Sequence, residues 1–499
     1  MTELSRIADT VWGLLKYDPA NPMIFSSGIF LFLFAAFTFF YGFMRRRPVL
    51  RMVYVSLFSV YFYYKTSGIY FLLLVFVSVS DFLIGRKMAV TECRAGRRWL
   101  MALSVFINLG MLAYFKYTNL FVEIVNDLSG GDLLQFHKIF LPVGISFFVF
   151  QSMSYTIDIY RRQLQPLRCW LDYFFYLSFF PQLVAGPIVR ARDFIPQIRQ
   201  NPLTVTREMF GKGLFLIMTG LVKKAVISDY ISINFVDRIF DNPVLYGGFE
   251  NLMGVYGYAL QIYCDFSGYS DMAIGIALLL GFRFPKNFDS PYKSATITEF
   301  WRRWHISLST WLKDYLYISL GGNRRGRLRT YLNLIITMLL GGLWHGAALR
   351  FVLWGGFHGV LLALHKFFMG LFPKLKPVGG QMKRGWRIAG IVLTFNLVCL
   401  GWIFFRASDV SAGMDVLRQI FTDFDIALVP HVIAGYWEVF AMMAAGYILH
   451  FIPQRMQDKA CERVVKNAPV VNALIIVAII WVVMQVKSSE IQPFIYFQF

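Results

Sequence analysis

Long apolar runs separated by short charged loops constrain this chain more than any other feature of its sequence. Of its 499 residues, 57% are hydrophobic and only 16% are charged, whereas an ordinary soluble protein carries about 25% charged residues. A helix needs about 20 mainly apolar residues to cross a bilayer. Such runs begin near Phe25, Met52, Tyr70, Trp99, Ile139, Met209, Leu252, Tyr331, Phe351, Trp386, Tyr436 and Val471. We therefore predict an all-α polytopic membrane protein with about 11–12 transmembrane helices.

The charges between these runs indicate how the chain is oriented. Basic residues gather in every second loop, as in Arg45–Arg51 and Lys374–Arg387, and the intervening loops are neutral or acidic. Because cytoplasmic loops are enriched in lysine and arginine, both termini are predicted to lie outside. The net charge of +20 then reflects topology and contact with anionic lipid. It does not indicate nucleic-acid binding.

Three segments depart from simple spanning helices. Met1–Pro22 has the spacing of an amphipathic helix on the membrane surface, which leaves residues 23–499 as a single membrane domain. Leu171–Ile188 is apolar but contains prolines and is flanked by arginines, so it is predicted to be re-entrant and covered by protein. Leu252–Phe282 is long and polar enough to form two pieces. Together these segments suggest additional helices around an interior cavity.

Three histidines are candidate residues of a functional site. His345 lies between glycines deep in an apolar run, where an ionisable residue usually faces a cavity or pathway. His305 falls on the apolar line of Phe300–Tyr315, which is predicted to be one amphipathic helix at the cytoplasmic face. His358, on the next crossing, can support the same site. For each histidine, simple packing in the core stays open as the alternative.

Other polar residues allow two readings each. Asp265 and Asp271 interrupt an apolar run, and they either orient a histidine or pair structurally with Arg283 or Arg302. The glycine-rich turn at residues 321–326 contacts either anionic lipid or a cytosolic phosphate-bearing donor. The histidines lack the spacing of zinc ligands, so no metal is predicted.

These residues belong to a long ordered set of motifs that resembles the membrane-bound O-acyltransferase family. The similarity is to the bacterial branch that contains the alginate O-acetylase membrane subunit and the D-alanyl transfer protein of teichoic acid synthesis, and it covers most of residues 23–405. The motifs are Met23–Ser27, Tyr114–Tyr117, Leu141–Phe147, Gly186–Pro187, Asp265–Asp271, Thr298–Trp311, Asp314–Tyr317, Leu320–Asn323 and Gly341–Gly346.

The resemblance implies a ring of helices around a central funnel, and acyl transfer from a cytosolic thioester to a hydroxyl outside the cell. It implies that His345 is essential and that His305 is the second polar member of the site. The neighbours expected to bind substrate or support the histidines are Asp265, Asp271, Trp301, Arg302, Arg303, Trp304, Asn323, Trp344 and His358.

The expected donor is acetyl-coenzyme A or a carrier-protein thioester, used as a substrate, with no tightly bound cofactor. We expect an acetyl group as cargo, an extracytoplasmic relay or transferase protein as partner, and the bacterial inner membrane as location. D-alanyl or other acyl transfer to a cell-wall polymer stays open. A transporter or flippase, or a scaffold subunit, is the non-catalytic alternative.

Overall fold

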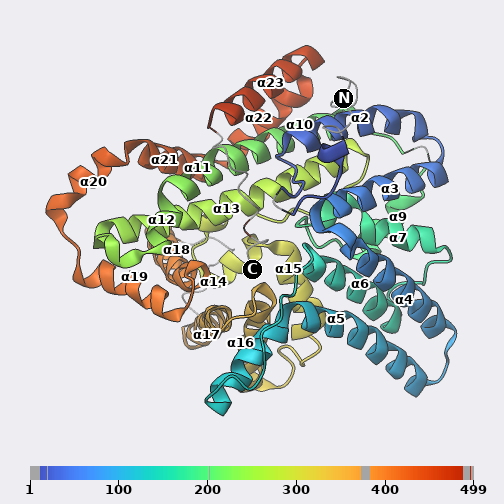
Figure 1. Cartoon of the computed structure of the whole chain (residues 1–499), viewed down its shortest axis with the longest axis horizontal. Helices are drawn as coiled ribbons and strands as arrows, with labels where there is room; N and C mark the ends of the chain where they lie inside the picture. The colour runs from blue at the N-terminus through green and yellow to red at the C-terminus, as the bar shows by residue number, and fades with distance from the viewer. Residues whose placement is uncertain (1–11, 20, 202, 373–382, 487–494, 496–499) are drawn as a thin grey trace, which may run out of the picture. The chain divides into compact units, whose positions relative to one another are not determined.

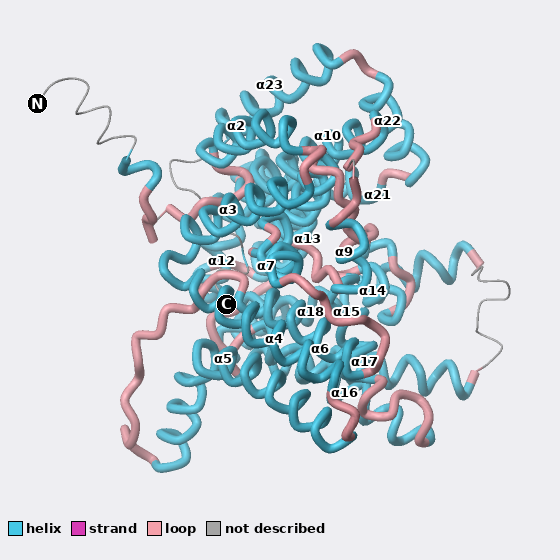
Figure 2. Tube along the Cα trace, turned by 90° about the vertical axis from the view of Figure 1, so that its right-hand side faces the viewer, coloured by secondary structure: helices cyan, strands magenta, loops and turns pink. Residues whose placement is uncertain are grey.

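The computed structural model describes residues 12–19, 21–201, 203–372, 383–486 and 495. Within these residues the chain forms helices joined by loops and no strand, as Figure 2 shows. This confirms the all-α prediction. Most of the predicted surface segment Met1–Pro22 lies outside the described residues.

Backbone contacts group the chain into two compact units that interleave along the sequence. Unit 1 comprises 1–217, 269–285 and 491–498, and unit 2 comprises 218–268, 286–490 and 499. The single membrane domain predicted for residues 23–499 stays a prediction.

Unit 1 is built mainly from residues 1–217. Its helices are α2 (Gly28–Met44), α3 (Pro48–Ser67), η1 (Gly68–Tyr70), α4 (Phe71–Val90), α5 (Arg94–Ser129), α6 (Ile145–Tyr160), α7 (Trp170–Ser178), α8 (Phe180–Leu183) and α9 (Ala191–Ile198).

Two helices, α10 (Arg207–Leu221) and α13 (Gly248–Leu279), pass from one unit into the other. The remaining helices of unit 2 are η2 (Val222–Ser228), α11 (Asp229–Ile231), η3 (Ser232–Val236), α12 (Asp237–Asp241), η4 (Pro243–Leu245), η5 (Pro291–Lys293), α14 (Ile297–Arg303), α15 (Ile306–Trp311), η6 (Leu312–Tyr317), α16 (Gly326–His345), α17 (Leu349–Leu371), α18 (Arg384–Arg406), α19 (Val410–Thr422), η8 (Ile426–Leu428), α20 (Val429–Gly435), α21 (Trp437–Phe451), α22 (Gln454–Lys466) and α23 (Pro469–Val486).

Fewer helices are long and apolar enough to cross a membrane than the sequence predicted. Among the described residues there are five, or six if the pair bent by 89° before Trp437 counts as one span. The five are Pro48–Val90, Arg94–Ser129, Leu349–Leu371, Arg384–Arg406 and Pro469–Val486. All twelve predicted segments are helical, but α2, α6, α10 and α21 have only 15 to 17 residues. Several apolar runs fold into short helices, so the all-α polytopic frame is confirmed and the count of 11–12 spans stays a prediction.

Helix α13 corrects the prediction of a break in the segment Leu252–Phe282. The sequence suggested that Leu252–Phe282 breaks into two pieces, but α13 continues for 32 residues through its polar middle. Its glycines serve close packing. A Cβ on Gly268 would lie 2.8 Å from the carbonyl oxygen of Gly220, and one on Gly275 would lie 2.6 Å from that of Gly213. The polar stretch is therefore accommodated by neighbouring backbone and side chains without a helix break.

The predicted break within Leu171–Ile188 is confirmed. Helix α7 ends at Ser178, and the short helix α8 follows from Phe180 to Leu183. Every residue from 172 to 190 is buried. Irregular backbone at membrane depth needs such cover, because its polar groups cannot be left facing lipid. That the segment enters and leaves on one side of the membrane stays a prediction.

Candidate active site

Helices α16 and α17 form a hairpin that carries two of the three candidate histidines, and Figure 1 shows the two helices side by side. Small residues let their backbones touch. A Cβ on Gly342 would overlap the carbonyl oxygen of Phe351 and lie 3.1 Å from Gly355 Cα. A Cβ on Gly359 would lie 2.8 Å from Ile335 Cα. The glycines of the sequence motif are therefore needed for direct backbone contact.

His345 is the last residue of α16, and Gly346 leaves the helix with extended backbone. The imidazole is buried and enclosed by aromatic rings. Its centroid lies 5.0 Å from the ring of Trp344, 5.1 Å from Trp354 and 5.3 Å from Phe405. The predicted buried position of His345 is thus confirmed, and it lies where a helix ends and backbone groups become available.

His305 lies at a break that the sequence did not predict. The expected continuous amphipathic helix over Phe300–Tyr315 is wrong, because α14 ends at Arg303 and α15 begins at Ile306. At the break His305 has φ 42°, in the left-handed region that non-glycine residues seldom adopt. Its side chain is fully buried, as its position on the apolar line predicted.

The rings around His305 connect it to His345. The centroid of His305 lies 4.6 Å from that of Phe266 on α13 and 6.2 Å from that of Trp344. Trp344 therefore contacts both imidazoles at the carboxyl end of α16. Burial lowers the pKa of His305 to about 3, so the imidazole is neutral at physiological pH.

The third histidine joins the same cluster from α17. His358 is fully buried, 4.9 Å from the ring of Trp354 and 5.2 Å from that of Trp301. Neither of its ring nitrogens has a hydrogen-bond partner within the described ranges. We call His305, His345, His358, Trp301, Trp344 and Trp354 the histidine–tryptophan cluster.

Two cluster neighbours on α18 were missed by the sequence analysis. The ring of Trp402 lies 5.8 Å from Trp354 and 5.0 Å from the predicted site residue Trp304. Phe405 lies 5.3 Å from His345. The three-residue spacing of Trp402 and Phe405 puts them on one face of α18. This spacing is the only sequence signal that could have identified them.

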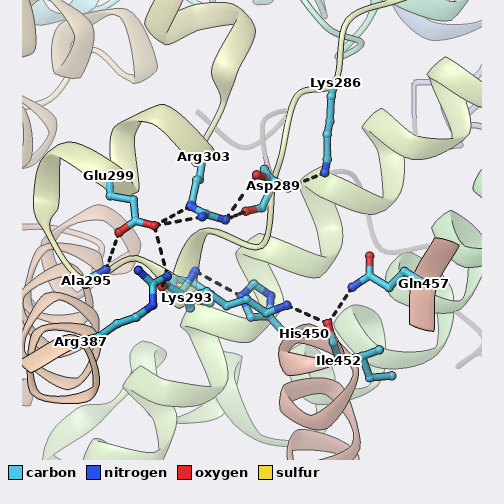
Figure 3. A network of polar contacts seen from close by, with 11 residues as sticks. Lys286, Asp289, Lys293, Ala295, Glu299, Arg303, Arg387, His450, Ile452 and Gln457 are labelled. Carbon is cyan, nitrogen blue, oxygen red and sulfur yellow. Dashed lines mark hydrogen bonds and ion pairs between the residues drawn. The ribbon is translucent and has the colours of Figure 1, made fainter. Parts of the chain in front are cut away.

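The predicted site residue Arg303 belongs to a network of polar contacts, which Figure 3 shows. Arg303 bonds Glu299 at 3.0 Å and the backbone oxygen of Asp289 at 3.0 Å, and Arg302 is exposed. Partial burial raises the pKa of Asp289, but Lys286 and Arg303 outweigh it and hold the pKa below its ordinary value. The network ties the loop before η5 to α14.

The predicted residue Asn323 lies in the exposed basic turn. Its Oδ1 accepts hydrogen bonds from Tyr317 at 2.5 Å and Lys366 at 2.7 Å. Gly321 and Gly322 there have φ of 109° and 54°, which confirms that glycine supplies unusual backbone angles. The substrate roles of Arg302, Arg303 and Asn323 stay predictions.

The two aspartates have different surroundings. Asp265 forms a buried ion pair with Lys224 at 2.6 Å, and Lys224 also contacts Asp229 at 2.7 Å. The partner of Asp265 is therefore Lys224 on the π-helical segment η2, and the expected pairing with Arg283 or Arg302 is wrong for this residue. Asp271 follows six residues later on α13, on a different face of the helix. Its role stays a prediction.

These features by themselves define a class of protein. The chain is a helical, multi-pass membrane protein with buried histidines that can move a proton away from solvent. The model of the membrane-bound O-acyltransferase family matches residues 147–407.

Three curated relatives extend this match. A probable alginate O-acetylase of Pseudomonas putida is 37% identical over 96% of this chain and 100% of its own length. A probable alginate O-acetylase of Pseudomonas syringae is 42% identical over 80% of this chain and 75% of its own. A peptidoglycan O-acetyltransferase of Helicobacter pylori is 36% identical over 79% of each chain. The chain belongs to the membrane-bound O-acyltransferase family and is an acyltransferase enzyme of the membrane.

Proposed function

We propose that the enzyme transfers an acetyl group from a cytosolic thioester, acetyl-coenzyme A or an acylated carrier protein, to a hydroxyl outside the cytoplasm. The hydroxyl belongs to a polysaccharide or to a relay protein that passes the acetyl group on, and the enzyme resides in the bacterial inner membrane. The names of the relatives support this proposal, since they are an alginate O-acetylase and a peptidoglycan O-acetyltransferase. D-alanyl transfer is the alternative acyl chemistry.

One observation carries the proposal. Two buried imidazoles, His305 and His345, contact the same indole, Trp344, in an aromatic surrounding. Aromatic walls exclude water, which protects a thioester from hydrolysis and strengthens interactions with charge that develops during transfer. The cluster therefore suits transfer of an acyl group between two substrates.

His345 is proposed as the general base. The acceptor oxygen bonds to the acyl carbon while the bond from that carbon to the donor sulfur breaks, and the sulfur keeps the bonding electrons. The hydroxyl proton passes to His345 and then to the sulfur. Imidazole ordinarily titrates near pH 6.5, which suits both steps, and such a base accelerates a reaction by about 10²–10⁴-fold.

The placement of His345 supports a path between two compartments. Helix α16 begins in the basic turn and ends at His345, and its 20 residues correspond to about 30 Å along the helix axis. This length matches the hydrocarbon core of a bilayer. With the basic turn in the cytoplasm, as its charge predicts, His345 faces the acceptor side.

The test compares two histidine variants in purified protein. His345→Ala should release no thiol from labelled acetyl-coenzyme A in the presence of acceptor and should form no acetylated product, while its abundance and melting temperature stay close to wild type. His431→Ala, at an exposed position on α20, is the matched control. Full acetylation by the His345 variant would remove His345 from the mechanism. Substrate movement without a covalent product would favour a transporter.

A further inference from the structure

A single side chain, Asn287, organises the strained turn that presents His305. Asn287 is fully buried in the loop after α13, 18 residues before the histidine. Its backbone oxygen accepts a hydrogen bond from the Ile306 N–H at 2.8 Å. Its Oδ1 accepts from the Ser307 N–H at 3.2 Å and from the Ser307 hydroxyl at 2.8 Å. The same Oδ1 lies 3.2 Å from His305 Nδ1.

This geometry determines which nitrogen of His305 carries hydrogen. The backbone N–H of Ser307 can only donate, so the Asn287 side-chain atom that it faces must be the carbonyl oxygen. The same oxygen faces His305 Nδ1, and an oxygen without hydrogen can only accept. Nδ1 therefore carries the hydrogen. Since the buried ring is neutral, Nε2 holds a lone pair.

The backbone of the turn indicates that this arrangement is enforced. A non-glycine residue in the left-handed region costs on the order of 1 kcal/mol, and such strain persists only where the surroundings hold it. The strained residue here is His305 itself, with φ 42°. The hydrogen bonds that Asn287 accepts from Ile306 and Ser307 hold the two residues that follow His305.

We propose that Asn287 is a positioning residue that fixes His305 as the Nδ1–H tautomer. In this form Nε2 accepts a hydrogen bond from an N–H or O–H group of a substrate and cannot donate one to the acyl carbonyl. As the second polar member of the site, His305 either orients the donor or polarises the thioester carbonyl, and the tautomer selects the first role. This inference deepens the proposed acyl transfer and rests on it.

Four neighbouring side chains of His305, each on a different element, are neutral. They are Phe266 on α13, Phe288 in the loop, Ser307 on α15 and Trp344 on α16. The charged groups next to them along the chain are paired: Asp265 with Lys224, and Asp289 with Lys286 and Arg303. An aspartate at position 287 adds a negative charge next to the His305 ring.

Asn287→Asp tests this directly. The carboxylate keeps an acceptor for every donor of the turn, so the fold is retained, but its charge raises the pKa of His305 by about 1–3 units. We expect the acidic limb of the kcat/KM profile to become steeper than in wild type below about pH 4–6, because His305 then takes up a proton in addition to the general base. Ser309→Ala is the control: its hydroxyl bonds Trp304 in the same turn without contacting Asn287, so its profile should match wild type.

A purely structural Asn287 predicts a different result: Asn287→Asp would lower the melting temperature or leave it unchanged, with the wild-type pH profile in either case. That outcome would overturn the proposal. Nitrogen-15 NMR of histidine-labelled protein, with His305→Gln to assign the signal, reads the tautomer without using activity. An Nε2–H tautomer would refute the inference even if acetyl transfer is confirmed, and an Nδ1–H tautomer in an inactive protein would instead refute the proposed function.

Discussion

The contact between α16 and α17 gives the sharpest prediction for stability and activity together. Gly355→Ala places a methyl group against the carbonyl oxygen of Met338 and 3.1 Å from Gly342 Cα. Both atoms are backbone, so no side chain can rotate away, and the helices must separate by roughly 1 Å to reach ordinary contact. Overpacking of this kind costs about 1–3 kcal/mol of folding free energy.

The same displacement reaches the site, because Trp354 precedes Gly355 and its ring lies 5.1 Å from His345. Misplacement by about 1 Å can lower the rate about 10²-fold. We expect Gly355→Ala to melt at a lower temperature in detergent and to lose most acetyl transfer.

The adjacent glycine supplies the control. A Cβ on Gly356 would meet only the end of the Leu339 side chain, at 3.2 Å, which can move. Gly356→Ala should therefore keep its activity and gain up to about 1 kcal/mol from helix propensity. If both variants behave alike, or if Gly355→Ala melts and reacts like wild type, the reasoning about backbone contact is refuted.

Two further predictions concern buried polar groups. Lys224→Met removes the cation that pairs with buried Asp265 and should lower the free energy of unfolding by about 3–5 kcal/mol. Adding Asp265→Asn should restore much of the melting temperature. Equal melting temperatures of the single and double variants would contradict this. His358→Leu replaces a buried ring whose nitrogens have no hydrogen-bond partner in the described part of the chain, so the free energy of unfolding should change by less than about 1.5 kcal/mol. A larger loss in thermal unfolding experiments would show that the imidazole is hydrogen-bonded.

The sequence alone determined the membrane-embedded helical frame and the main candidate residue. Long apolar runs can satisfy their backbone only as helices in lipid, so the frame follows from local composition. A histidine between glycines in such a run is costly to bury, so its position along the chain is enough to identify His345 as a candidate. The motif around Trp301–His305 resembles a motif of the family and identified His305 as the second candidate residue.

Only the tertiary structure decided how these residues meet. At the helix break, His305 and the residues after it contact Asn287, 18 residues away, and helical periodicity cannot predict that contact. Asp265 pairs with Lys224 and not with the arginines expected from the sequence, because packing of α13 on η2 sets the distance. Local hydrophobicity fixes which segments become helices, but ring contacts and ion pairs depend on which surfaces those helices present to one another.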